Sequence, residues 1–225
     1  MLEGIRTALI IAPHPDDEVL GVGGTMAKLS AMGAKVHVAI VTRGQPPRFS
    51  AEFVKTVTDE CATAHRSLGV TQTHFLGFPA AELDRVPHAE LNARIGALVS
   101  EVAPDTLFLP FVGDIHLDHQ LVFTSALVAA RPRHGETPVR ILAYETLSET
   151  NWWAPGITPP FVPNVFVDIS DTLEAKLKAF ATFASQVKEA PDERSPDVIR
   201  ALAVVRGAAV YRSAAEAFML VRQVG

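Results

Sequence analysis

The sequence predicts an α/β protein with a Rossmann-like, mostly parallel sheet that has helices on both faces. Short apolar segments alternate with longer segments of helical periodicity, and the segments at 6–12 and 106–110 are as apolar as strands covered on both sides. The 225 residues are 48% hydrophobic, which is sufficient for a large buried core. No repeat or linker divides the chain, so we expect a single domain over residues 1–225.

The first half of the chain alternates strands and helices. Residues 6–12 (RTALIIA) predict the first strand. The next helix begins near Pro15, with acidic residues suited to its first turn, and ends before Gly33. The same alternation then predicts strands at 35–42, 73–76 and 106–110, and helices at 51–68 and 90–102.

The second half is less regular. It predicts strands at 139–144 and 165–169 and helices at 171–186 and 195–206. Between them, residues 152–163 hold four prolines together with Trp152 and Trp153. This composition is typical of an ordered loop, which we expect to lie over the site.

Composition excludes several classes of protein. The net charge is −5 with no long basic cluster, so we expect no nucleic-acid partner. No apolar stretch approaches the roughly 18 residues that span a bilayer, so we expect no membrane span. Cys61 is the only cysteine and cannot form an internal disulfide, which makes the cytoplasm the expected location. The apolar content also permits a homo-oligomer.

A histidine and three carboxylates follow the first predicted strand in the sequence His14-Pro15-Asp16-Asp17-Glu18. A histidine and an aspartate three residues apart can converge on one ion where the chain turns. Imidazole and carboxylate suit Zn²⁺, and Fe²⁺ is a second candidate. The alternative is structural: the acids would complement the helix dipole and His14 would be a polar turn residue.

A second polar cluster follows the fourth predicted strand and comprises Asp114, His116, Asp118 and His119. One histidine could bind a metal while the other is held protonated by the carboxylate between them. A capped helix start with solvated histidines is the alternative. Because ligands of open parallel sheets lie beyond the carboxyl ends of the strands, both clusters point to one crevice and favour a shared metal site.

These two clusters resemble the signature motifs of the PIG-L/LmbE family of zinc-dependent deacetylases. Residues 12–25 (APHPDDEVLGVGGT) and 114–120 (DIHLDHQ) carry the resemblance. Weaker similarities extend over nearly the whole chain, at 68–70, 104–105, 185–186, 194–195, 206–207 and 215–218. The resemblance implies that His14, Asp17 and His119 bind Zn²⁺ and leave one position open for water and substrate.

The resemblance also implies catalytic roles. Asp16 would be the general base, and His116, paired with Asp118, would stabilise the oxyanion or protonate the leaving amine. Amide hydrolysis requires a polarised carbonyl, an activated water and a proton donor, and these residues, with a cationic His116, match those requirements. The expected substrate is a small N-acetylated amino sugar or its conjugate.

The chain departs from the family pattern around the substrate. Arg43 lies in a segment after the second strand where many members have an acidic residue, and Ala80 stands where an aspartate is frequent. Arg43 could bind a phosphate or carboxylate of the substrate, or be solvated. Trp152 could stack on a sugar ring or anchor its loop. Gln186, in the Ser-Gln pair, is a third candidate for substrate binding.

Two alternative functions remain open. One is a metal-dependent amidase that acts on a non-sugar N-acyl substrate, and the other is a relative that binds metal or ligand without catalysis.

Several other residues are interpreted as structural. Gly23 and Gly24 follow the acidic turn and are expected to permit close packing rather than to bind a dinucleotide. His65 lacks a carboxylate neighbour at ligand spacing, as do His37 and His74, and is expected to be a structural or surface residue. Cys61 is expected to be a small buried hydrophobe.

Overall fold

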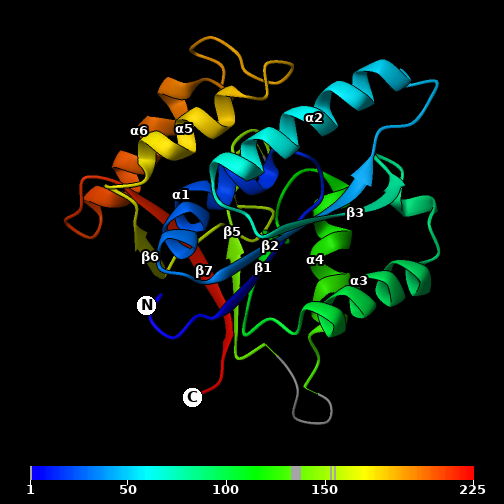
Figure 1. Ribbon diagram of the computed structural model, residues 1–225, viewed down its shortest axis with the longest axis horizontal. Coiled ribbons are helices and arrows are strands. Elements are labelled where there is room, and N and C mark those ends of the chain that lie inside the picture. The colour runs from blue at the N-terminus through cyan, green and yellow to red at the C-terminus, as the bar shows by residue number, and fades with distance from the viewer. Residues whose placement is uncertain (1, 133–137, 153, 155) are drawn as a thin grey trace.

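The protein was analysed as a computed structural model that describes residues 2–132, 138–152, 154 and 156–225. Its centre is a seven-stranded sheet with the strand order β3-β2-β1-β4-β5-β7-β6 (Figure 1). The strands, in chain order, are β1 (Thr7–Ala12), β2 (Lys35–Arg43), β3 (Gln72–Pro79), β4 (Thr106–Pro110), β5 (Arg140–Tyr144), β6 (Val165–Asp168) and β7 (Ala215–Gln223). Strands β1 to β5 are parallel to one another, whereas β7 runs antiparallel to both β5 and β6. The predicted fold class is therefore confirmed.

Helices cover both faces of the sheet. One face packs against α1 (Asp17–Ala31), α2 (Ala51–Ser67), α5 (Leu173–Ala181) and α6 (Pro196–Ala208). The other packs against α3 (His88–Val102) and α4 (Leu117–Ala129), as Figure 1 shows on its right-hand side. A short 3₁₀ turn, Leu83–Arg85, precedes α3. Alternate residues of β1 enter the two cores, so this strand is buried on both faces as its apolar sequence predicts.

Three elements differ from the sequence predictions. The strand β7 was not predicted. The strand β3 is longer than the predicted 73–76 because it continues through a bulge at Gly77, whose φ is 79°. Helix α5 ends at Ala181, not at 186, and turns there to bury Phe183.

Strand order brings the two polar clusters together. Strand β1 has β2 on one side and β4 on the other, so the chain reverses its winding direction between β1 and β4. A crevice forms beyond the carboxyl ends of strands at such a switch point. Residues 14–18 follow β1 and residues 114–119 follow β4, which places both clusters at this crevice.

Helix α1 packs unusually closely against its neighbours. A Cβ atom added to Gly21 would overlap the ring of Tyr144, and one added to Gly24 would lie 2.9 Å from the side chain of Ile169. Close packing at Gly24 is therefore confirmed. In addition, Glu216 of β7 accepts hydrogen bonds from the amides of Gly24 and Thr25, at 2.9 and 2.7 Å. This arrangement fixes α1 against the sheet directly behind the acidic turn.

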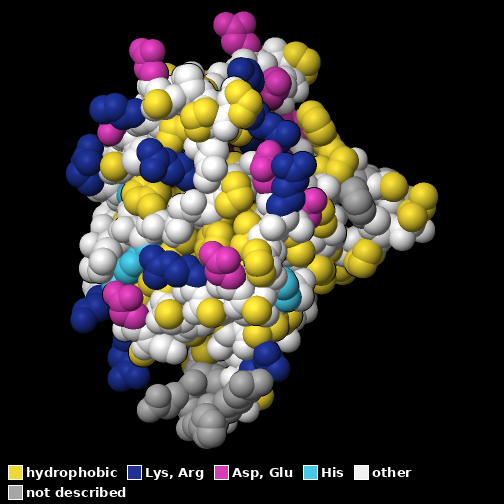
Figure 2. Space-filling model, turned by 90° about the vertical axis from the view of Figure 1, so that its right-hand side faces the viewer, with side chains coloured by type: hydrophobic (Ala, Val, Ile, Leu, Met, Phe, Trp, Pro, Cys, Tyr) yellow, Lys and Arg dark blue, Asp and Glu magenta, His cyan; other side chains and the backbone are white. Residues whose placement is uncertain are grey.

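The surface carries mixed charge. Figure 2 shows Lys and Arg side chains interspersed with Asp and Glu over one face, with hydrophobic side chains between them. Across the described ranges, no helix combines the length and hydropathy needed to cross a bilayer. Phe53 and Phe75 are exposed aromatic residues, and both line the cavity at the strand ends.

Candidate metal centre and active site

Three side chains from separate elements converge at the strand ends. His14 follows β1, Asp17 is the first residue of α1, and His119 lies in the first turn of α4. One ligand atom of each lies within 4.8 Å of the others. His14 Nδ1 and His119 Nε2 are each 3.2 Å from Asp17 Oδ2. The structure thus brings together the three predicted metal ligands.

The chemistry of this group fits a divalent cation. Asp17 Oδ1 and His119 Nε2 are buried and make no hydrogen bond among the described residues, although Nε2 lies 3.2 Å from Asp17 Oδ2. Buried polar atoms are rarely left unpaired, since each loses its hydration without compensation. A cation between the three side chains would satisfy both atoms, and two imidazoles with one carboxylate are a ligand set suited to Zn²⁺. Three protein ligands leave the fourth coordination position of a tetrahedral Zn²⁺ open for water or substrate, as in catalytic zinc sites.

A second layer of carboxylates orients the two histidines. Asp114 Oδ2 lies 2.8 Å from His119 Nδ1, and Asp118 Oδ2 lies 3.1 Å from His14 Nε2. Carboxylates in this position fix the ring and its tautomer so that the other nitrogen faces the ion. They direct His14 Nδ1 and His119 Nε2, the two atoms nearest to Asp17, towards the centre.

The charges at the centre also favour a cation. Burial raises the pKa of Asp17, but His119 and His14 outweigh burial and hold it well below its usual range. Burial lowers the pKa of His119, but Asp17 and Asp114 outweigh it and raise this pKa well above its usual range. Without a metal ion, the positive charge of protonated histidines therefore compensates the negative charge of the buried carboxylates. A metal ion would take over this role and displace the protons.

Two other groups of three side chains are less suited to a metal. In the group His14, His116 and Asp118, the Asp118 carboxylate already accepts hydrogen bonds from the amides of Ala81 and Leu83, at 2.7 and 3.3 Å. His116 Nδ1 accepts the Asp118 amide at 3.1 Å. The Asp118 oxygens and His116 Nδ1 are therefore already engaged in hydrogen bonds within the protein.

The third group lies behind the centre and comprises Glu18, Cys61 and His65. Glu18 Oε1 lies 2.9 Å from His65 Nε2, and His65 Nδ1 lies 2.7 Å from Thr73 Oγ1. Burial raises the pKa of the Cys61 thiol far above its usual value, so no thiolate is available. His65 is structural, as expected. Its carboxylate partner comes from a different element, which the local sequence spacing does not reveal.

Asp16 is positioned as a base beside the metal ligands. It is 1% exposed, and its backbone has a left-handed conformation with φ 106°. Its amide donates to Glu18 Oε2 at 3.1 Å. The pKa of Asp16 is raised to about 8, because burial raises it more than Arg194, whose Nη1 donates to Asp16 Oδ2 at 2.9 Å, lowers it. A cation held by the adjacent ligands would add a second positive charge and lower this pKa further.

His116 differs from the expectation in its partner and its charge. The resemblance pairs its ring with the Asp118 carboxylate, but that carboxylate contacts His14. His116 caps α4, and its Nδ1 accepts the amide of residue 118, so Nε2 carries the hydrogen of the neutral ring. Burial and the neighbouring His14 lower the pKa of His116 to about 4. The hydrogen bond accepted by Nδ1 and the lowered pKa both favour a neutral His116 ring over the cationic ring expected from the sequence, and its catalytic role stays a prediction.

A cavity of about 560 Å³ opens above these residues. Its lining comes from β2, β3 and α2, from the segments after β1, β2, β3, β4 and β5, and from the loop between α5 and α6. The catalytic candidates in the lining are His14, Asp16 and His116, with Asp17 and His119 buried beneath them.

The substrate-binding candidates have mixed outcomes. Arg43 and Gln186 line the cavity, and Gln186 Oε1 accepts a hydrogen bond from Arg194 Nη1 at 2.9 Å. Trp152 is 62% exposed and lies outside the lining. Trp153, which is expected from the sequence in a loop over the site, lies outside the described residues.

Sequence reasoning missed two polar lining residues. Arg194 contacts Asp16, and its only sequence signal was the Arg-Ser pair among the weaker similarities. Glu149, whose pKa is raised to about 7 by burial, follows β5 in a segment without periodicity.

Comparisons with known proteins identify a family of deacetylases. Residues 9–130, more than half of the chain, match the model of the PIG-L family, which is described as GlcNAc-PI de-N-acetylase. The chain is 29% identical over 219 residues to diacetylchitobiose deacetylase of Thermococcus kodakarensis, covering 90% of this chain and 78% of that protein.

A second relative is the 1D-myo-inositol 2-acetamido-2-deoxy-alpha-D-glucopyranoside deacetylase of Mycolicibacterium smegmatis. It is 28% identical over 240 residues, covering 83% of this chain and 82% of that protein. Among solved structures, N,N'-diacetylchitobiose deacetylase from Pyrococcus horikoshii superposes with a TM-score of 0.78 and 25% identity, covering 98% of this chain and 85% of that one.

Proposed function

The chain belongs to the PIG-L family, and on that basis we propose that it is a metal-dependent hydrolase that removes the N-acetyl group of an amino sugar or an amino-sugar conjugate. The observation that carries the proposal is the group His14, Asp17 and His119, with two unpaired buried ligand atoms, directly beside the buried carboxylate of Asp16. Similarity to deacetylases of N-acetylated sugars supports the substrate class. Residues 1–225 are taken as one catalytic domain.

The proposed metal site consists of His14 Nδ1, Asp17 and His119 Nε2. A bound Zn²⁺ would supply a Lewis acid for the amide carbonyl and would make water acidic enough to lose a proton near neutral pH. The ligand set also accepts Fe²⁺, which makes the identity of the ion a matter for measurement.

Side chains of the protein would carry out the proton transfers. Asp16 takes a proton from the attacking water. Arg194 orients the Asp16 carboxylate and, together with the bound cation, would lower its pKa so that it can act as a base. His116 lines the cavity, and the Nε2–H of its neutral ring would donate to the oxygen that becomes negative as water adds to the carbonyl carbon. When the C–N bond breaks, the proton held by Asp16 passes to the amine, and acetate leaves.

Two variants test this proposal together with the wild type. We expect about one metal ion per wild-type chain and acetate release from one or more N-acetylated sugars. His119→Ala should lose both the bound metal and acetate release, because the substitution removes a metal ligand. Asp16→Asn should retain the metal and lose roughly 10²–10⁴ of kcat, because it removes only the base.

Asp59→Asn is the matched control, since Asp59 is exposed and pairs only with Lys55 on the surface. It should behave as the wild type in both measurements. Full activity of Asp16→Asn on a good substrate would rule out Asp16 as the base. Wild-type protein that binds its ion and a sugar but releases no acetate from any substrate would favour the non-catalytic alternative.

A further inference from the structure

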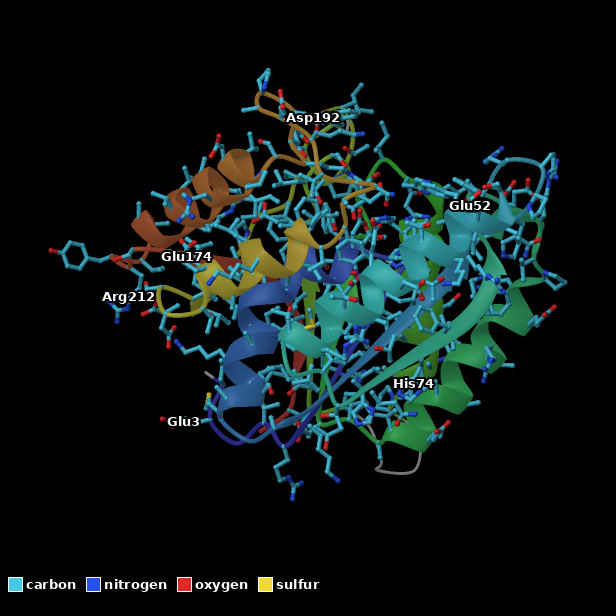
Figure 3. All side chains as sticks on the ribbon, turned by 45° about the horizontal axis from the view of Figure 1, so that its top comes forward. Glu3, Glu52, His74, Glu174, Asp192 and Arg212 are labelled. Carbon is cyan, nitrogen blue, oxygen red and sulfur yellow. The ribbon has the colours of Figure 1, made fainter. Side chains whose placement is uncertain are left out.

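The cavity has an apolar side that the proposed chemistry does not use. Its apolar wall consists of Phe49, Phe53, Val54, Val57 and Phe75, which come from the loop before α2, from α2 itself and from β3. The catalytic residues come instead from the segments after β1 and before α4 and from the loop between α5 and α6. In Figure 3 the start of α2, marked by Glu52, lies apart from that last loop, marked by Asp192.

The wall is ordered and accessible. The rings of Phe49 and Phe53 stack, with centroids 5.9 Å apart and an interplanar angle of 16°. Phe49 packs closely over Gly44, where an added Cβ would lie 2.8 Å from the ring. Nevertheless, Phe53 is 38% exposed and Phe75 is 45% exposed. Aromatic surface held in place and left open to a cavity is typical of a binding site for an apolar group.

Apart from Arg43, the polar side chains on this side donate their hydroxyl protons to backbone carbonyls. The Thr58 hydroxyl donates to the Val54 carbonyl at 2.7 Å, and the Thr42 hydroxyl donates to the Pro13 carbonyl at 2.8 Å. Ala80 lines the cavity at the position where the family resemblance leads one to expect an aspartate. Away from Arg43, a sugar hydroxyl buried against the Phe and Val side chains of this wall would lose water without regaining a hydrogen bond, which is unfavourable.

We propose that the substrate carries an aryl or alkyl group that packs against the apolar wall while its amide lies at the metal centre. The inference rests on the proposed amide hydrolysis. It narrows the substrate class to an amphipathic N-acyl amine, which a cavity of about 560 Å³ is large enough to hold. The apolar group has two potential sources: an acyl chain longer than acetyl, or an apolar substituent on the amine side such as the aglycone of a glycoside.

The test compares kcat/KM for amine release by the metal-loaded enzyme from three substrates. N-acetylglucosamine is the reference, its phenyl β-glycoside places the apolar group on the amine side, and N-hexanoylglucosamine places it on the acyl side. At least one apolar substrate should exceed the reference by about tenfold or more, and the preferred one identifies the source. Equal kcat/KM for all three would overturn the proposal and leave the deacetylase function intact.

Variants connect the preference to the wall. In Phe53→Ser/Phe75→Ser the ratio of kcat/KM between the preferred substrate and the reference should fall about tenfold. Tyr211→Ser is the matched control, because Tyr211 is also an exposed aromatic residue but lies outside the cavity lining. Its ratio should equal that of the wild type. A double variant with an unchanged ratio would overturn the proposal.

A binding measurement separates this inference from the proposed function. Titration calorimetry with phenyl β-D-glucosaminide and with glucosamine should give tighter binding of the phenyl compound to the wild type, and this advantage should be lost in the double variant. Tighter binding of the phenyl compound, without amine release from any substrate, would support the apolar binding site and contradict the proposed deacetylase function. Equal affinities of the wild type for the two compounds would overturn the proposal. If the wild type were then found to be a dimer and the double variant a monomer, the wall would be assigned to contact with a second copy of the chain.

Discussion

At the scale of single residues, the conformation of Asp16 is the least ordinary feature of the site. A non-glycine residue with φ 106° is strained and persists only where its surroundings impose it. Here the Asp16 amide is held by Glu18, Glu18 by His65, and His65 by Thr73 of the edge strand. The base is therefore oriented from behind by a buried chain of hydrogen bonds that does not include the metal ligands.

Arg194 sets the ionisation of this base. Burial raises the pKa of Asp16 and Arg194 lowers it, so Arg194→Met should raise it. Because a base must be deprotonated to act, the acidic limb of the pH profile of kcat/KM should move to higher pH. At pH 7 kcat/KM should fall roughly tenfold or more. The measurement is kcat/KM for acetate release between pH 5 and 9.

Arg200→Met provides the control for this prediction. Arg200 also pairs with a carboxylate, that of Glu174, but on the surface and away from the cavity. Its profile should overlay that of the wild type. If the Arg194→Met profile did so as well, Arg194 would have no electrostatic role in catalysis.

At the scale of elements, the glycines of α1 determine how closely this helix approaches the sheet. Gly21→Ala and Gly24→Ala should each lower the free energy of unfolding by about 1–3 kcal/mol, because the new methyl group would collide with Tyr144 or Ile169. Urea denaturation of each variant measures the change.

Gly96→Ala is the matched substitution in another helix. Gly96 lies within α3, and an added Cβ there meets no atom within 4 Å. Alanine is the better helix former, so this variant should gain about 0.5–1 kcal/mol. Destabilisation of Gly96→Ala equal to that of the α1 variants would show that steric crowding is not the cause.

The sequence predicted elements well where local pattern alone decides the structure. The strand at 106–110 and the helix at 51–67 have an apolar run and a clear periodicity respectively, and the structure agrees closely. In contrast, β7 contains Glu216, and a glutamate in the sequence predicts a surface position. Its burial is made possible by Lys176 of α5, whose Nζ lies 2.7 Å from Glu216 Oε1. That pairing joins distant segments and leaves no local pattern.

The same distinction applies to the site. The two clusters that contain His14, Asp17 and His119 could be placed at one site because each lies between a parallel strand and the next helix, and parallel strands end at one edge of the sheet. The family resemblance then implied these three residues as the ligands. Arg194 and Glu149 lie in irregular segments whose position depends on the packing of the completed fold. The apolar wall was missed for another reason: in a helix such as α2, an apolar residue that faces a cavity has the same spacing as one that faces the core.

At the scale of the whole molecule, the metal centre joins the segment after β1 to α1 and α4. Removal of the ion by a chelator should abolish acetate release and lower Tm by about 5–10 °C, since an ion bound only by the folded state stabilises it. Both should recover when Zn²⁺ is added back. Differential scanning calorimetry and an acetate assay measure the two effects.

His119→Ala serves as the control for the chelator, because it already lacks a ligand and its Tm should not fall further. Wild-type protein shown to be free of metal, but with unchanged Tm and activity, would contradict a metal-dependent function.

The division of the cavity between elements has an evolutionary consequence. The reacting groups lie on segments beside the central strands β1 and β4, whereas most of the apolar wall lies on α2 and on β3 at the edge of the sheet. Mutations in α2 and β3 can therefore change which molecules are accepted without altering any proposed metal ligand or the base. Selection can diversify the substrate range of such a protein in small steps, each of which preserves the reaction.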